Sequence, residues 1–147
     1  MERFHYTPRE QHALVLARQL VDEVFFKGEV SRIDGLITES GSLRHSLAGR
    51  AQDRDGFVQM VRDFHAAFPG FDVIVEDSVV RGGVAVIRWT AYGTHGGPWL
   101  GVQSSGKEVT VAGVVYCDAS EDGGAPRLNA CWFHFDALSL LRQVGGW

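Results

Sequence analysis

The sequence predicts an α+β fold in which N-terminal helices cover one face of a curved, antiparallel or mixed β-sheet. Three observations support this prediction: helical periodicity in the first half of the chain, four strand-like runs in the second half, and turn residues between those runs. Helices followed by a strand meander favour packing of the helices on one side of the sheet. A curved sheet closed in this way forms a cone, and a cone with polar groups inside is a candidate ligand pocket.

The 147 residues are expected to form one domain, residues 1–147, with its own hydrophobic core. The net charge of −4 and the lack of a Lys/Arg cluster argue against nucleic acid or a membrane as partner. We find neither a membrane-spanning apolar run nor a signal-peptide pattern, so we expect a cytoplasmic protein. Cys117 and Cys131 fall in expected strands and are expected to be reduced. No Cys or His spacing indicates a zinc site, so no metal is expected.

A capping box marks the start of the first helix. Thr7 occupies the N-cap, Pro8 the first helical position and Glu10 the third position after the cap. Apolar residues then recur at helical spacing as far as Gly28, which favours a helix end. A short helix is expected over residues 31–37.

The second long helix has the clearest pattern in the chain. Its apolar residues follow the spacing of one helix face and are Phe57, Met60, Val61, Phe64 and Phe68. Pro69 and Gly70 end this helix. The polar stretch before it, residues 38–49, indicates a loop with a short strand near His45. A last short helix is expected over residues 137–144.

Four strands are expected, at residues 71–80, 82–95, 107–118 and 127–136. Side chains alternate along a strand, and the more apolar set of the second strand should face the helices. That set is Ala85, Ile87, Trp89, Ala91, Gly93 and His95. His95 is therefore expected to point inward at the far end of the strand.

In the last strand, alternation alone does not identify the inner face. Trp132, His134 and Asp136 share one face, while the other face, Cys131, Phe133 and Phe135, is equally apolar. If Trp132 is inside, His134 and Asp136 are inside with it. Asp136 also precedes a helix, where an aspartate N-cap contributes about 1 kcal/mol, and this structural interpretation is favoured without other information.

Other candidates also have structural interpretations. His95 and His45 lie in turn-like or polar stretches, where a histidine is more often solvated than functional. Trp89, Trp132, Phe64 and Phe68 are explained equally well as core residues. From the residues alone, the sequence indicates a soluble α+β domain with a candidate pocket.

The chain from about Gly56 to Gly145 resembles the SnoaL-like polyketide cyclases, which share the cone-shaped fold of ketosteroid isomerase. Four stretches carry the resemblance, in the family's order and spacing: FHAAFPGFDVIVEDSVV, VAVIRWTAYGTHGGPWLGV, SGKEVTVAGVVYC and DALSLLRQVG. The first helix and the region around His45 fit more loosely. The sequence also departs from the family pattern, because Ala130 and Cys131 replace acidic or histidine residues and His134 takes a commonly apolar place.

The resemblance implies a cyclase that closes a ring in a polyketide-type intermediate by an aldol-type reaction, in natural-product biosynthesis. It implies that Asp136 acts as acid/base, that His95 hydrogen-bonds the developing oxyanion, and that His134 assists. The substrate, a hydrophobic small molecule, is expected to contact an inner set of residues, which are His45, Phe64, Phe68, Trp89 and Trp132. No metal or organic cofactor is implied.

Two further functions compete with the cyclase. Relatives on this scaffold open epoxides or assist hydroxylation, and His134 beside Asp136 would form a base–orienter pair for such chemistry. Alternatively, the protein is a ligand-binding or dimerisation module in which Asp136 only caps a helix. In the cone fold the outer sheet face often packs against a second subunit, so a homo-oligomer, dimer or tetramer, is expected, with Val84, Val86, Thr90 and Tyr92 as contacts.

Overall fold

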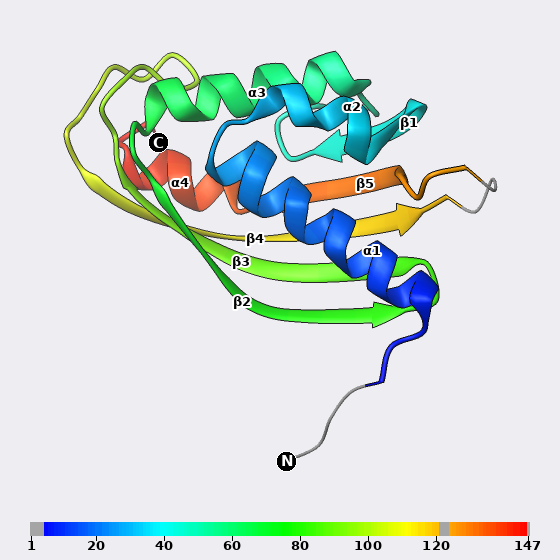
Figure 1. Ribbon diagram of the computed structural model, residues 1–147. Coiled ribbons are helices and arrows are strands. Elements are labelled where there is room, and N and C mark those ends of the chain that lie inside the picture. The colour runs from blue at the N-terminus through cyan, green and yellow to red at the C-terminus, as the bar shows by residue number, and fades with distance from the viewer. Residues whose placement is uncertain (1–4, 121–123, 147) are drawn as a thin grey trace.

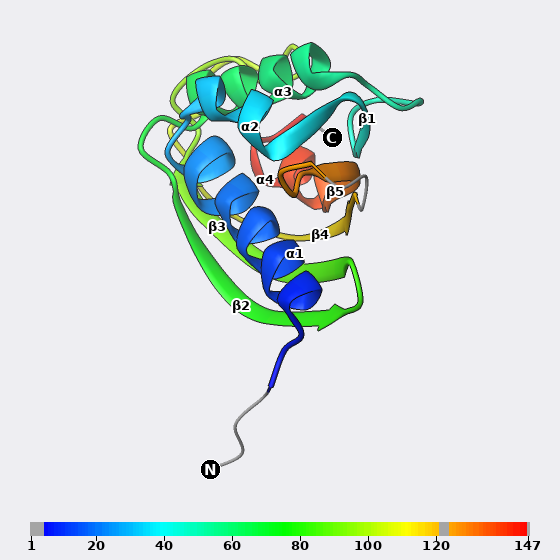
Figure 2. The same cartoon turned by 45° about the vertical axis from the view of Figure 1, so that its right-hand side comes forward.

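The computed structural model describes residues 5–120 and 124–146 and confirms the α+β fold. Its strands are β1 (Ile37–His45), β2 (Asp72–Arg81), β3 (Val84–Thr94), β4 (Glu108–Ala119) and β5 (Leu128–Phe135). They form one sheet in the order β1-β5-β4-β3-β2, with β1 parallel to β5 and the other neighbours antiparallel. The sheet curves around α1 (Pro8–Gln19), with α2 (Ile33–Leu36) and α3 (Arg54–Ala67) beyond it (Figures 1 and 2).

The predicted capping box is present at the start of α1. The Glu10 N–H donates to Thr7 Oγ1 at 3.1 Å, and the Thr7 N–H donates to Glu10 Oε1 at 3.0 Å. The other carboxylate oxygen of Glu10 accepts the Gly82 N–H at 3.1 Å, which fastens α1 to the β2–β3 turn. The helix continues as a π-helix, Leu20–Phe26, which the sequence pattern did not reveal, and ends near Gly28, whose φ is +71°.

The apolar stripe of α3 faces the core as predicted. Asp53 caps the helix by accepting the Gly56 N–H at 2.9 Å, and Gly70 follows the helix with a φ of +72°. On the flank of α3, His65 Nε2 lies 2.6 Å from the Phe25 carbonyl oxygen, so this histidine joins α3 to the π-helix. The short helix expected at residues 31–37 is a 3₁₀ turn, Val30–Arg32, followed by α2.

Strand β1 differs from the sequence prediction. Residues 38–49 were expected to form a loop with a short strand, but Ile37–His45 is a strand that pairs with β5. An irregularity between Ile37 and Ser42 interrupts the alternation of buried and exposed residues, which explains why a period-two pattern is not visible in the sequence. A Cβ at Gly41 would lie 2.8 Å from the Thr38 carbonyl oxygen, so this bend favours glycine.

The core lies between the inner face of the sheet and the helices. The predicted inner set of β3 is confirmed, with its side chains from Ala85 to Ala91 buried. Gly113 of β4 lies under the Trp89 ring, and a Cβ there would overlap the ring. Helix α4 (Ala137–Gln143) is joined to β4 by the side-chain amide of Gln143. This amide accepts a hydrogen bond from the Thr110 N–H and donates one to the Thr110 carbonyl, each at 2.8 Å.

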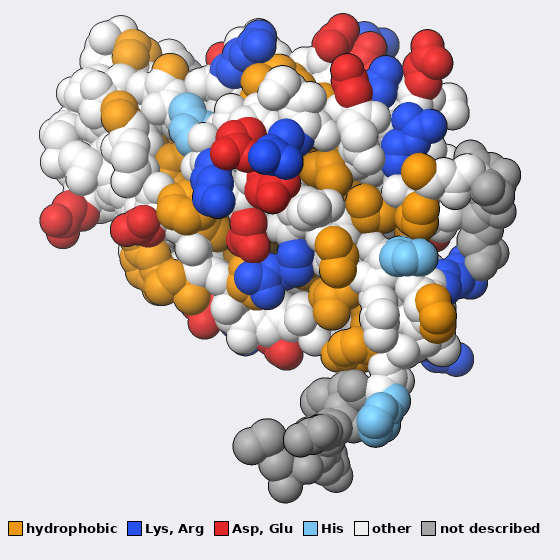
Figure 3. All heavy atoms as spheres, in the orientation of Figure 1, with side chains coloured by type: hydrophobic (Ala, Val, Ile, Leu, Met, Phe, Trp, Pro, Cys, Tyr) orange, Lys and Arg blue, Asp and Glu red, His pale blue; other side chains and the backbone are white. Residues whose placement is uncertain are grey.

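The surface carries both charged and hydrophobic side chains. On the side seen in Figure 3, acidic and basic side chains are interspersed with hydrophobic ones. Ion pairs such as Arg18–Asp22 and Arg32–Glu29 join side chains of opposite charge. Among the described residues, ten large hydrophobic side chains are exposed, and six of these belong to strands β2 to β5: Ile74, Val79, Tyr92, Val114, Tyr116 and Trp132. None of the helices within residues 5–120 and 124–146 has the length and apolar character of a membrane span.

Candidate active site

His95, the residue that directly follows the C-terminal end of β3, has a buried polar side chain. Its side chain is 0% exposed. The β3–β4 pairing continues past it, because the His95 N–H donates to the Lys107 carbonyl at 2.9 Å. Alternation along β3 places Trp89 and Ala91 inside, and it therefore places His95 inside as well. The prediction that His95 points inward is confirmed.

The two ring nitrogens of His95 have different surroundings. Nδ1 lies 3.2 Å from the backbone nitrogen of Ser105, which donates to it, and 2.9 Å from Ser105 Oγ. Because a backbone N–H can only donate, Nδ1 accepts, and the proton of the neutral ring belongs on Nε2. Nε2 is buried and has no hydrogen-bond partner within the described residues. An unmatched buried N–H costs about 1–3 kcal/mol, so this atom is a candidate contact for a ligand oxygen.

Aromatic side chains close the interior next to His95. The Phe68 ring centroid lies 5.6 Å from that of His95, and the Trp99 ring lies 5.8 Å from Phe68. Backbone bonds of 2.9 Å in both directions join Trp99 to Val102 across a tight turn. In this turn Leu100 has a φ of +48°, a conformation that leucine rarely adopts. The turn thus holds Trp99 against Phe68 although its backbone conformation is unfavourable for leucine.

A narrow cleft, partly open to solvent, lies between the end of α3 and strands β3 and β4. A cavity of about 10 Å³, enough for one water molecule at most, is lined by Phe64, Phe68, Phe71, Ala91, Tyr92, Gly93, Val109 and Val111. Phe64 and Phe68, two of the predicted substrate contacts, therefore lie at the cavity. Trp89 packs against Phe133, with ring centroids 5.2 Å apart, and its indole Nε1 is also buried without a partner in the described part of the chain.

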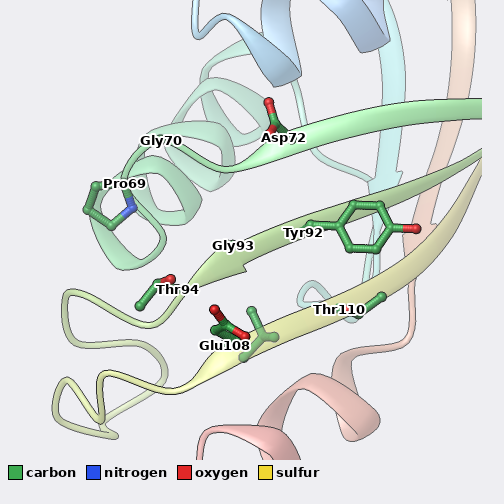
Figure 4. Close-up of a pocket in the computed structure, with 9 residues that line it drawn as sticks. Pro69, Gly70, Asp72, Tyr92, Gly93, Thr94, Glu108 and Thr110 are labelled. Carbon is green, nitrogen blue, oxygen red and sulfur yellow. The ribbon is translucent and has the colours of Figure 1, made fainter.

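A larger hollow, of about 390 Å³, lies at the ends of β2, β3 and β4 (Figure 4). Its polar side chains are the carboxylates of Asp72 and Glu108 and the hydroxyl groups of Tyr92, Thr94 and Thr110. These residues occupy the outer positions of the strands and are exposed or half-buried. The hollow therefore belongs to the outer face of the sheet.

The structure identifies the inner face of β5, which alternation left open. Cys131, Phe133 and Phe135 are buried, so Trp132, His134 and Asp136 lie on the outer face. Asp136 is exposed and caps α4, because its Oδ1 accepts the Ser139 N–H at 3.0 Å.

The predicted roles of these three residues require their side chains to face the cavity. They lie on the outer face of the sheet instead. The cause is that the cysteine and phenylalanine side chains fill the core, while Trp132 stacks edge-on against Tyr116 outside. The structure thus brings His95, Phe64 and Phe68 together and leaves Trp132, His134 and Asp136 apart from them.

His45 is buried at the end of β1. Its Nδ1 accepts the Leu47 N–H at 3.3 Å. Burial lowers the pKa of His45, and the charge of nearby His134 lowers this pKa further. Next to it, Ser46 Oγ donates to the Phe135 carbonyl at 2.9 Å and accepts the Phe135 N–H at 2.8 Å, which extends the β1–β5 pairing. His45 is thus inside the fold, as its predicted role requires, but at the edge strand.

The two cysteines lie opposite each other on β4 and β5. Both are free thiols with Sγ atoms 3.5 Å apart, and the expectation that both cysteines are buried is confirmed. The hydrogen bond that the protonated Cys117 thiol makes with Cys131, together with burial, raises the pKa of Cys117. These thiols are therefore core residues.

Sequence reasoning did not find Ser105 or Trp99. Both lie in the glycine-rich stretch between β3 and β4, where no helical or strand period relates one residue to another. The contact between Ser105 and His95 depends on how this loop closes on α3, since the Gly96 and Gly97 N–H groups both donate to the Ala67 carbonyl. The abundance of glycine was the one available signal.

Known proteins share this architecture. A candidate SnoaL-like polyketide cyclase from Jannaschia sp. CCS1 is 21% identical and has a TM-score of 0.83, with 97% of each chain covered. IdmH from Streptomyces antibioticus, a candidate polyketide cyclase, is 23% identical with a TM-score of 0.73, over 89% of this chain and 96% of its own. AclR from Streptomyces galilaeus, a candidate hydroxylase, is 19% identical with a TM-score of 0.78, over 94% and 83%.

These similarities to solved structures show the cone-shaped fold, and no curated protein matches the sequence. The sequence profile described as SnoaL-like polyketide cyclase matches residues 15–144, which is most of the chain. The protein therefore belongs to the SnoaL-like polyketide cyclase family.

Proposed function

We propose that the protein is a cofactor-independent cyclase that closes a ring in a polyketide-type intermediate, as part of natural-product biosynthesis. One observation supports this proposal above the others: His95 keeps a buried, unmatched Nε2–H among aromatic side chains inside the cone. A preorganised donor in such a dry site stabilises negative charge on a reacting oxygen far better than a solvated donor does.

The proposed reaction is an intramolecular aldol addition. The His95 Nε2–H donates a hydrogen bond to a ketone oxygen of the substrate, which makes the ketone carbon more electrophilic. A carbon between two other carbonyl groups loses its proton to water, and these carbonyls delocalise the charge. The enolate carbon then attacks the ketone carbon, and the new alkoxide oxygen takes the proton back from the hydronium ion, which returns the water molecule. His95 is unchanged at the end of the cycle.

The aromatic residues bind the substrate in this proposal. Phe64 and Phe68 line the narrow cavity, so a substrate enters by displacing their rings. The folded shape imposed on a flexible polyketone brings the two reacting carbons together, which supplies much of the rate acceleration. Asp136 and His134 take no part in this scheme, because both lie on the outer face.

The test is a turnover assay on linear polyketone esters with His95→Phe, which keeps an aromatic ring and removes the donor. We expect a loss of about 100-fold or more, the usual cost of one oxyanion donor. His12→Phe, at an exposed position of α1, is the matched control and is expected to retain wild-type turnover. Full turnover by a folded His95→Phe variant would refute the proposal.

Epoxide opening or hydroxylation is the second candidate. The structural similarity to AclR, a candidate hydroxylase, favours keeping it. The same Nε2–H would activate an epoxide oxygen for attack by water or an internal hydroxyl group. A panel of epoxides tested beside the polyketone esters distinguishes the two reactions.

We also propose that the outer face of the sheet packs against a second copy of the chain. Val79, Val86, Tyr116 and Trp132 follow one another across four strands in register. In the next row, Asp77 and Arg88 are register partners of opposite charge, a pattern that favours pairing with an identical face.

A further inference from the structure

We propose that Ser105 is a positioning residue that keeps the proton of His95 on Nε2 and thereby selects ligands that present a carbonyl oxygen. This inference rests on the proposed function, because His95 is the donor in that reaction. Ser105 does not itself contact the substrate in this scheme. It acts on the opposite nitrogen of the ring.

The geometry around Ser105 fixes the direction of each hydrogen bond. Its backbone N–H donates to His95 Nδ1 at 3.2 Å. Its hydroxyl oxygen lies 3.3 Å from the Lys107 nitrogen, whose N–H donates to it, and 2.9 Å from His95 Nδ1. With Oγ accepting from Lys107, the hydroxyl proton is directed to Nδ1. Two donors of Ser105 therefore point at Nδ1. A proton on Nδ1 is unfavourable, because it would meet the hydrogen atoms of both donors.

The consequence for the other nitrogen follows from the chemistry of imidazole. A neutral ring that accepts at Nδ1 carries its proton at Nε2, so the buried end of His95 is a donor. This end needs an acceptor, and the described residues provide none. A ligand carbonyl oxygen supplies one, whereas a methylene group at the same place leaves the N–H unmatched, which weakens binding.

Ser104 provides an internal comparison. Its hydroxyl also bonds His95, but at the backbone carbonyl oxygen, 3.1 Å away. Both serines therefore fasten the same loop to the same residue, and Ser105 alone of the two reaches the imidazole. If Ser105 only held the loop in place, loss of its hydroxyl group would affect the His95 ring and kcat in the same way as loss of the Ser104 hydroxyl group.

The first experiment uses the wild-type protein and needs no substrate. Nitrogen-15 NMR of the histidine side chains distinguishes a protonated from an unprotonated ring nitrogen, and His95→Phe assigns the His95 signals by their loss. We expect the His95 signals of the Nε2–H form. Signals of the Nδ1–H form would overturn the inference, whatever the activity of the protein.

The second experiment compares Ser105→Ala, Ser105→Thr and Ser104→Ala. Ser105→Ala removes the shorter of the two hydrogen bonds to Nδ1, at 2.9 Å, and keeps the one from the backbone N–H, at 3.2 Å. We expect a weaker preference for the Nε2–H form, so that part of the His95 rings carry the proton on Nδ1, and a fall in kcat of about 10-fold, the lower end of what loss of a supporting partner costs at metal-binding histidines. Ser105→Thr should restore both the tautomer and kcat, and Ser104→Ala should leave the ring signals unchanged. Identical ring signals and kcat in Ser105→Ala and Ser104→Ala would overturn the inference.

These outcomes separate the inference from the proposed function. If His95→Phe retains turnover, the proposed function fails even when the NMR signals show the expected tautomer. If His95→Phe is inactive while the Nδ1–H form is observed, a cyclase that needs His95 stands, but hydrogen-bond donation by Nε2 and the role of Ser105 both fail.

Discussion

The two faces of β5 carry similar side chains in very different surroundings. Phe133 on the inner face is buried, and its ring packs within 5.5 Å of three others, those of Phe25, Phe57 and Trp89. Trp132, the preceding residue on the outer face, is 36% exposed and contacts one ring, that of Tyr116. Aromatic character therefore did not decide which residue is inside. The fit of the whole set, Cys131 with Phe133 and Phe135, against the helices decided it.

The two faces of the sheet differ in how strongly a polar side chain on them can interact with a substrate. His95 shares the inner, dry side with Phe68, so a hydrogen bond from its ring is strong. Asp136 belongs to the outer, wet side, where its carboxylate caps α4. Four expected outcomes test this difference between the faces, each measured as a change in the free energy of unfolding.

The largest expected effect is at the inner face of β5. Phe133→Ala should lower the free energy of unfolding by about 3–5 kcal/mol, because it leaves a cavity among packed rings. Trp132→Ala should lower it less, because this side chain is 36% exposed and its loss leaves no enclosed cavity. Urea denaturation of both variants measures the contrast, and equal losses would contradict the inner and outer assignment.

The next effect concerns the cap of α4. Asp136→Ala should cost about 1 kcal/mol through loss of the N-cap, while Asp136→Asn should cost little because asparagine caps helices equally well. The same urea titrations measure both variants. An Asn variant as unstable as the Ala variant would show that the charge of Asp136, rather than its capping oxygen, matters.

A smaller, pH-dependent effect is expected at His45. Its folded-state pKa lies below the ordinary value of 6.5, so the unfolded chain binds a proton more readily than the folded protein does. This contribution to stability is complete above about pH 6.5 and is lost as the pH falls through that value towards the folded-state pKa. His45→Gln should reduce the slope of stability against pH between pH 8 and pH 5. An unchanged slope would contradict the burial of this histidine.

The smallest effect on folding is expected at the outer face of β2. Val79 is 65% exposed in the single chain, so Val79→Lys should change the free energy of unfolding of the monomer by no more than about 0.5 kcal/mol. The same substitution should convert the proposed dimer to a monomer, because it places a charge in an apolar row. Light scattering after size-exclusion chromatography measures the mass. An unchanged dimer would place the interface elsewhere.

Much of the fold was predictable, because local signals agreed with one another. The capping box of α1, the apolar stripe of α3, and Gly28 and Gly70 at the ends of these two helical segments are consistent with one another. Of strand β1, only the short stretch near His45 was predicted, since a register irregularity hides the alternation in its first part and its partner, β5, is distant in sequence. The site was predictable at His95, where alternation along β3 applies.

The rest of the site depended on packing that a single strand does not encode. Cys131 and Trp132 are equally plausible inner residues in sequence, and only the shape of the helix layer distinguishes them. Ser105 lies in a loop whose sequence has no helical or strand periodicity. Its contact with His95 is therefore known only from the structure of that loop.

The most direct test of the central claim compares His95→Phe with Asp136→Asn on the same polyketone ester, with kcat/KM as the measured quantity. The buried donor is expected to be essential, so His95→Phe should lose about 100-fold or more while Asp136→Asn stays near the wild type. The reverse pattern, an inactive Asp136→Asn and an active His95→Phe, would contradict the claim that the working group lies inside the cone.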